Sequence, residues 1–106
     1  MREKTQARYH ARASNDIDEH ALYIAGDELD AGLRFLNSVH ESFDELVRHP
    51  EIGVARHFDS PILSGLRVWP VRHFENWLIF YRIGRTELTA LRILHASRDL
   101  PSALEE

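Results

Sequence analysis

The sequence contains no cysteine. This absence excludes disulfide bonds, thiolate zinc sites and cysteine nucleophiles. No apolar run approaches the roughly 20 residues that a bilayer-spanning helix needs, and residues 1–13 lack the apolar core of a signal peptide. We therefore expect a cytoplasmic protein that does not enter a membrane.

Lysine is almost absent, because Lys4 is the only one among 13 basic residues. The formal net charge of −4 argues against binding nucleic acid by bulk electrostatics. The charge is unevenly distributed: residues 14–51 carry ten acidic and two basic side chains, whereas residues 54–98 carry three acidic side chains and seven arginines. Arginine is suited to bidentate recognition of carboxylates or phosphates, so the basic half is a candidate binding surface.

The 106 residues, of which 43% are hydrophobic and 28% charged, indicate one folded domain spanning 1–106 with a modest core. Residues 5–13 show weak alternation and predict a short strand. Ser14 is the predicted N-cap of a first helix that ends near Gly26, and a second helix runs from about Glu28 to His49, where Pro50 ends it. Two adjacent amphipathic helices predict an antiparallel hairpin.

Residues 53–65 show no periodic spacing of apolar residues, which predicts a loop. Three strands are predicted after it, at 66–72, 77–83 and 88–95. Gly84 and Arg85 predict a tight turn with a positive φ at the glycine, while Pro70 predicts a bulge or a sheet edge. Residues 99–106 predict a short helix or tail. The fold class is therefore α+β, with the order β-α-α-β-β-β and the helical hairpin on one face of a small, mostly antiparallel sheet.

The segment 77–81 is apolar on both faces, which indicates a strand that is covered twice. The hairpin can cover only one face. We expect a partner protein to cover the other, because a bare second face would exceed the apolar patch that a soluble monomer usually exposes.

Four motifs occur in a familiar order: Pro-Glu-Ile-Gly at 50–53, Gly-Leu-Arg-Val-Trp-Pro-Val at 65–71, Leu-Ile-Phe-Tyr-Arg at 78–82 and Leu-Arg-Ile-Leu-His-Ala-Ser-Arg-Asp at 91–99. Together they resemble the RelE/ParE toxin superfamily, and most of all its ParE branch of plasmid-stabilisation toxins. The resemblance implies the toxin of a type II toxin–antitoxin pair, neutralised by a ParD-like antitoxin. It also implies DNA gyrase as the target, whereas RelE-type relatives cleave messenger RNA on the ribosome.

The seven histidines make a metal site one hypothesis to consider. However, no two of them have the sequence separation that places two zinc ligands on one face of a helix. The sequence also lacks a Gly-x-Ser-x-Gly elbow and a phosphate-binding glycine loop. We therefore expect no metal and no cofactor.

A metal-free ribonuclease is the enzymatic alternative, since cleavage through the 2′-hydroxyl needs proton transfer and cations. Arg67, Arg72, Arg82 and Arg92 could supply the cations, and His73, His95 or Tyr81 the proton transfer. The competing interpretation is that the arginines pair with an acidic partner or with helical carboxylates. We favour the latter and predict no catalytic residue, because lysine is nearly absent and eleven residues follow His95, unlike in RelE-type nucleases. A third hypothesis is a binding module that has lost its target.

The predicted antitoxin-binding residues are Arg67, Trp69, Trp77, Arg82 and Arg92. The predicted target-binding residues are His95, Arg98, Asp99 and Leu100, at the end of the sheet and in the tail that nuclease relatives tend to lack. We expect no direct contact with nucleic acid.

Overall fold

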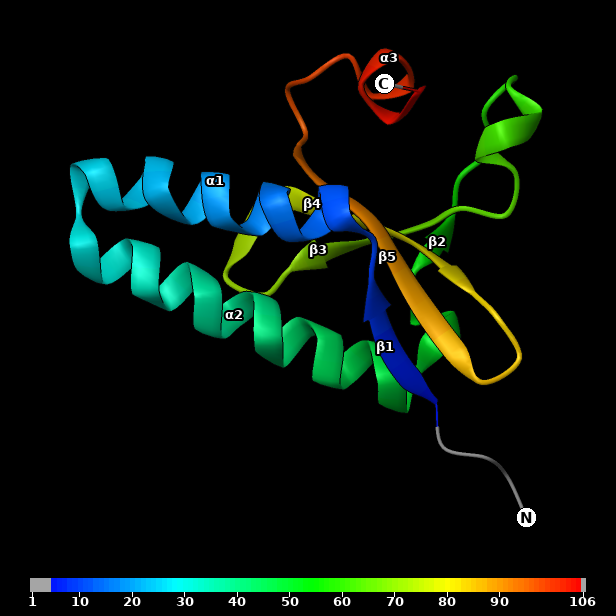
Figure 1. Ribbon diagram of the computed structural model, residues 1–106, viewed down its shortest axis with the longest axis horizontal. Coiled ribbons are helices and arrows are strands. Elements are labelled where there is room, and N and C mark those ends of the chain that lie inside the picture. Colours follow the sequence, from blue (N-terminus) through cyan, green and yellow to red (C-terminus); the bar gives the residue numbers. More distant parts are fainter. Residues whose placement is uncertain (1–4, 106) are drawn as a thin grey trace.

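The computed structural model describes residues 5–105 and confirms the predicted α+β class (Figure 1). Its elements are β1 (Gln6–Tyr9), α1 (Ala11–Asp27), α2 (Leu29–Arg48), the 3₁₀ turn η1 (Pro50–Ile52), β2 (Val54–Ala55), the 3₁₀ turn η2 (Pro61–Leu63), β3 (Arg67–Val71), β4 (Phe74–Ile83), β5 (Glu87–His95) and α3 (Leu100–Glu105). None of the helices in residues 5–105 combines the length and apolar character needed to cross a bilayer.

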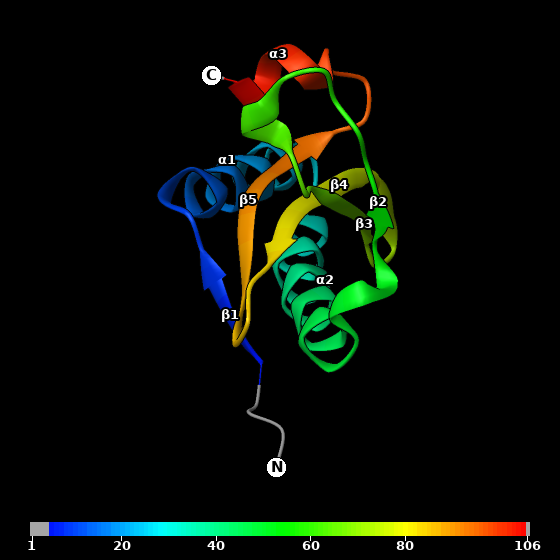
Figure 2. The ribbon, with the colours of Figure 1, turned by 90° about the vertical axis from the view of Figure 1, so that its right-hand side faces the viewer.

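The five strands form one sheet in the order β1-β5-β4-β3-β2. All neighbours are antiparallel except β1 and β5, which run parallel. Figure 1 shows α1 and α2 side by side as the predicted hairpin. Figure 2 shows α3 beside η2, at the end of the molecule opposite the N-terminal strand. The chain termini of the described segment therefore lie at opposite ends of the sheet.

The first helix begins earlier than predicted, and Ser14 is not its N-cap. The cap is His10, whose ring nitrogen accepts the Arg12 N–H at 3.2 Å. The His10 N–H donates to the Ala90 carbonyl at 2.9 Å, which completes the pairing of β1 with β5. The alternation of apolar and polar residues extends through residue 13 and therefore predicted a strand there. Ala11 and Ala13 are also good helix formers, and they lie in the first turn of α1.

The turn between β4 and β5 lies at residues 84–86, as predicted, but Gly84 does not have the predicted positive φ. Among the described residues a positive φ occurs only at Gly65 and at His73 (φ 67°), which lies in the turn between β3 and β4. The predicted loop at 53–65 contains β2 and η2. The prediction for Pro70 is confirmed, because the register between β3 and β4 shifts between Pro70 and Val71.

The larger core lies between the sheet and the helical hairpin. Its fully buried large side chains include Phe35, Phe43, Leu46, Ile79, Tyr81 and Ile93. These positions on α2 follow helical spacing and those on the strands follow alternation, so one face of each element is buried.

The second face of the sheet is covered by the chain itself, contrary to the expectation that a partner must cover it. Phe80 and Leu94 are fully buried there, with Leu100 and Ala103 of α3 packed over them. Phe58, from the segment before η2, adds to this cover. The apolar character of both faces was predicted correctly, but the short last helix supplies the cover because its apolar residues lie on one side.

Side chains of α1 complete an otherwise open edge of β5. The strand β1 pairs only with residues 87–90 of β5. Beyond that point, the Asp16 carboxylate accepts the Ile93 N–H at 3.0 Å, and His20 Nε2 donates to the Ile93 carbonyl at 2.6 Å. Two helical side chains thus replace a missing strand.

Candidate functional site

Tyr81 anchors the segment that follows α2. Its hydroxyl donates to the Pro50 carbonyl at 2.7 Å and accepts the Gly53 N–H at 2.9 Å. Arg67 Nη1 donates to the Gly53 carbonyl at 2.8 Å and to the Glu51 carbonyl at 3.3 Å. Burial raises the pKa of the Tyr81 phenol above its usual value, although the Gly53 N–H and the Arg67 charge oppose the rise. The Pro-Glu-Ile-Gly motif is therefore held by a neutral hydroxyl.

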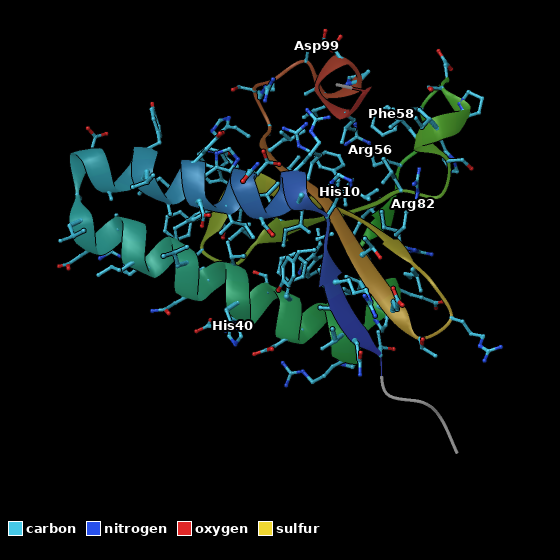
Figure 3. The ribbon with its side chains drawn as sticks, viewed as in Figure 1. His10, His40, Arg56, Phe58, Arg82 and Asp99 are labelled. Atoms are coloured by element: carbon cyan, nitrogen blue, oxygen red, sulfur yellow. The ribbon has the colours of Figure 1, made fainter. Side chains whose placement is uncertain are left out.

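Arg82 has a comparable role at η2. Its Nε donates to the Ser64 carbonyl at 3.0 Å, and its Nη2 donates to the Ile62 carbonyl. Figure 3 shows Arg82 on the same side of the molecule as Arg56 and Phe58. Arg67 and Arg82 are both half-buried, so each combines a structural contact with a partly accessible guanidinium.

Arg92 lies deeper than the sequence suggested and is 8% exposed. Its Nε and Nη2 donate to the two Asp16 oxygens at 2.7 and 3.0 Å, and its Nη1 donates to the Ala103 carbonyl at 2.9 Å. This bidentate pair connects α1, β5 and α3. The geometry explains how a six-residue helix is held on the second face of the sheet.

The two tryptophans pack against the larger core and remain half-exposed. Trp69 Nε1 donates to the Glu45 carboxylate at 3.2 Å. The Trp77 ring lies between two histidines, with ring centroids 4.2 Å from His20 and 4.8 Å from His95. Each tryptophan therefore presents only part of its ring to solvent.

The predicted target-binding residues lie together in the segment that leads from β5 into α3. His95 Nδ1 accepts the Ser97 N–H at 3.1 Å, and Asp99 accepts the Ser102 hydroxyl at 3.0 Å. Arg98 and Asp99 are exposed, whereas Leu100 is buried at 8%. Figure 3 shows Asp99 beside α3 at the edge of the molecule. His95 is half-buried, so three of the four residues are at least partly accessible.

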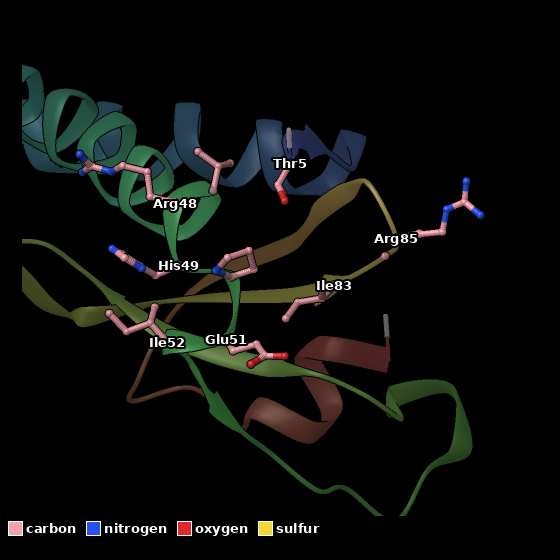
Figure 4. A pocket seen from close by; sticks show the side chains of 10 residues that line it. Thr5, Arg48, His49, Glu51, Ile52, Ile83 and Arg85 are labelled. Atoms are coloured by element: carbon pink, nitrogen blue, oxygen red, sulfur yellow. The ribbon is translucent and has the colours of Figure 1, made fainter. Parts of the chain in front are cut away.

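A broad hollow of about 950 Å³ lies between the end of α2 and the turn that joins β4 to β5 (Figure 4). Ile52 and Ile83 provide apolar contacts, and Arg48, His49 and Arg85 surround them. Sequence reasoning missed this site. The signal that could have revealed it is Ile52 in the Pro-Glu-Ile-Gly motif, an apolar residue that the hydrogen bonds of Tyr81 and Arg67 hold at the surface.

His73 and His95 line one hollow beside Trp77, but Tyr81, Arg82 and Arg92, which were also considered for RNA cleavage, are not among its lining residues. The Tyr81 hydroxyl has two backbone partners, and Arg92 is paired with Asp16. His73 lies in the β3–β4 turn, at the opposite end of β4 from Arg82. Within residues 5–105 no group of three or more histidine or carboxylate side chains could hold a metal ion.

These features define a small α+β protein with a helical hairpin on one face of a mixed five-stranded sheet and a short helix on the other. The family model described as the ParE toxin of type II toxin–antitoxin system, parDE, matches residues 7–100, and the chain belongs to this family. The motif resemblance to ParE is thereby confirmed.

A solved structure agrees at the level of the fold. A chain described as the chromosomal ParDE TA system from P. aeruginosa is similar to this chain with a TM-score of 0.68 and 18% sequence identity. The similarity covers 87% of this chain and 96% of that one. A search of curated proteins found no match.

Proposed function

We propose that this ParE-family toxin is neutralised by a ParD-like antitoxin and acts by binding DNA gyrase, without chemistry of its own. The observation that carries the proposal is the family match across residues 7–100, which includes the whole sheet except one residue of β1. The pairing of Arg92 with Asp16 and of Tyr81 with backbone groups supports a binding mechanism, because a nuclease needs such groups free to contact a phosphate. The messenger RNA interferase remains the alternative to be tested.

Induction of the toxin without its antitoxin tests the proposal. We expect filamentation and DNA-damage signalling while messenger RNA stays intact, because a gyrase poison blocks an enzyme on DNA. The purified protein should also inhibit gyrase supercoiling. The control is co-expression of the antitoxin encoded beside the toxin, which should restore growth. Codon-phased cuts in messenger RNA within minutes, with supercoiling unaffected, would instead establish the interferase.

Point substitutions, and not truncation, are needed to test whether the tail residues bind the target. Deleting residues 101–106 would remove Ala103, whose carbonyl accepts from Arg92, and would uncover Phe80. Arg98→Ala changes an exposed side chain, so the growth assay with this variant tests target binding, while circular dichroism checks the fold. Asp99→Ala also removes the acceptor of the Ser102 hydroxyl in α3, so its stability is measured beside its toxicity.

We further propose that the antitoxin contacts the predicted residues whose side chains stay partly exposed, namely Arg67, Trp69, Trp77 and Arg82. Partial exposure supports this proposal, because a partner can reach these groups without unfolding the toxin. Tryptophan and arginine are also enriched among residues that dominate binding energy. Arg92 would contribute indirectly, by holding α3 through Ala103.

Arg82→Gln should weaken antitoxin binding by about 1 kcal/mol, since a partly exposed ion pair is screened by solvent. The loss should be largest at low salt. Titration calorimetry at two salt concentrations measures it, and circular dichroism checks that the fold is kept. Arg34→Gln, on the exposed side of α2, is the matched control and should bind normally. Equal affinity for Arg82→Gln and the unsubstituted toxin would contradict the proposed contact.

A further inference from the structure

The hollow between the end of α2 and the turn from β4 to β5 has the size of a small-molecule site. Its volume of about 950 Å³ lies within the range of about 300–1,000 Å³ that ligand pockets span. None of the residues proposed to contact the antitoxin or the target is among its described lining residues. The hollow is therefore a separate candidate for a binding site.

The floor of the hollow is apolar and preformed. Ile52 and Ile83 line it and are 37% and 38% exposed. On either side of Ile52, the Tyr81 hydroxyl donates to the Pro50 carbonyl at 2.7 Å and accepts the Gly53 N–H at 2.9 Å. Tyr81 itself is fully buried. Because this anchor fixes the backbone around Ile52 in advance, a ligand can cover the floor with little loss of conformational entropy.

Two arginines at the rim have no acidic partner. Figure 4 shows Arg48 and Arg85 on opposite sides of the hollow, with Ile83 between them. In the described part of the chain, no ion pair joins either arginine to a carboxylate. Glu87, two residues after Arg85, is paired with Arg8 at 3.1 Å. Both exposed guanidinium groups are therefore available to an anion.

The side chains around the hollow define the chemistry of its ligand. Arg48, His49 and Arg85 are its basic lining residues, and Thr5 adds a hydroxyl. Glu51 is the one acidic residue among those that the structure describes there. A purely polar anion would leave the isoleucines uncovered, and an uncharged apolar molecule would leave the guanidinium groups without a partner. A molecule that carries an anionic group on an apolar body satisfies both.

We propose that this hollow binds a small organic anion. Its apolar body lies on Ile52 and Ile83, and its anionic group pairs with Arg48 or Arg85. Carboxylate, phosphate and sulfonate groups all present a pair of oxygens to the guanidinium fork. The inference goes beyond the proposed function, because it assigns a ligand to a surface that neither the antitoxin nor the target is proposed to contact.

Two fluorescent probes with the same apolar body test the proposal on the full chain, namely anilinonaphthalene sulfonate and its neutral analogue phenylnaphthylamine. We expect the sulfonate to saturate one site per chain and to bind about tenfold more tightly than the neutral probe. Decanoate should displace the sulfonate, whereas inorganic phosphate at the same concentration should not, because it lacks an apolar body. Equal affinity for the two probes, or no saturable binding of the sulfonate, would overturn the proposal.

Substitutions in the hollow separate its two components. The double variant Arg48→Gln, Arg85→Gln should bind both probes equally, because it removes the cations that recognise only the sulfonate. Ile52→Gln should weaken both probes about threefold, since it removes the apolar contact that they share. Circular dichroism checks that each variant keeps its fold. A double arginine variant that still prefers the sulfonate would contradict the proposed pairing.

The matched control is the double variant Arg34→Gln, Arg72→Gln. It removes the same charge from two exposed ion pairs outside the hollow, and it should keep the preference for the sulfonate. If the control loses this preference equally, the net charge of the chain selects the anion and the proposal fails. Loss of sulfonate binding in the variant Leu29→Gln, Leu33→Gln would place the probe on α2 and would also overturn the proposal.

Discussion

Asp16→Ala is expected to lower the free energy of unfolding by about 3–5 kcal/mol, because it leaves the buried Arg92 charge without its carboxylate. Both side chains of this pair are less than a tenth exposed. The substitution also removes the acceptor of the Ile93 N–H. Since small domains are stable by only about 5–15 kcal/mol, the variant should unfold at much lower urea concentration. Urea titration followed by circular dichroism measures the change.

Two controls separate this buried pair from surface charge. Arg8→Ala breaks the Arg8–Glu87 pair, whose side chains are 65% and 43% exposed, and should change stability by less than about 1 kcal/mol. The double variant Asp16→Leu, Arg92→Met removes both charges and should recover part of the loss. If Asp16→Ala and Arg8→Ala destabilise equally, the Asp16–Arg92 pair does not hold α1, β5 and α3 together.

Gly53→Ala is expected to destabilise the fold by about 3 kcal/mol, through overlap with Tyr81 and loss of its hydrogen bonds. A Cβ at this position would overlap the Tyr81 hydroxyl and lie 2.7 Å from Cε1. The backbone at Gly53 has φ −69° and ψ 150°, which any residue can adopt, so the requirement for glycine is one of space. Thermal and urea unfolding measure the effect.

Gly26→Ala is the matched control for that substitution. Nothing lies within 4 Å of a Cβ built at Gly26, which is in the last turn of α1. Alanine there should leave stability unchanged or raise it by up to about 1 kcal/mol, because alanine is the better helix former. A Gly53→Ala protein as stable as the unsubstituted chain would show that Tyr81 can move away at little cost.

The helical hairpin could be predicted from the sequence because its signals are local. Apolar residues recur at helical spacing through α2, and the His49–Pro50 pair ends that helix. The bulge at Pro70 follows in the same way from the missing N–H of proline. The start of α1 could not be predicted, because His10 caps the helix only where β1 has paired with β5.

The residues of the candidate site were also predicted only in part. The sequence predicted the arginines and tryptophans as antitoxin-binding residues, but Arg67 and Arg82 also hold backbone carbonyls of neighbouring loops. The cover of the second sheet face was assigned to a partner, since nothing in the local pattern showed that α3 would fold back over Phe80. Spacing alone also does not show that Leu29, Leu33 and Leu36 of α2 stay exposed, because two adjacent rows of one helix have the same spacing.

By itself, the sequence determined the α+β class, the order of the main elements and the family, since periodicity, proline positions and ordered motifs are properties of short segments. Only the tertiary structure decided which charges are buried and which surfaces remain open. Arg92 and Asp16 are 76 residues apart in the chain, and their contact exists only because α1 runs along the edge of β5. Electrostatic partners depend on distances across the fold, and burial then sets how strongly two charges interact.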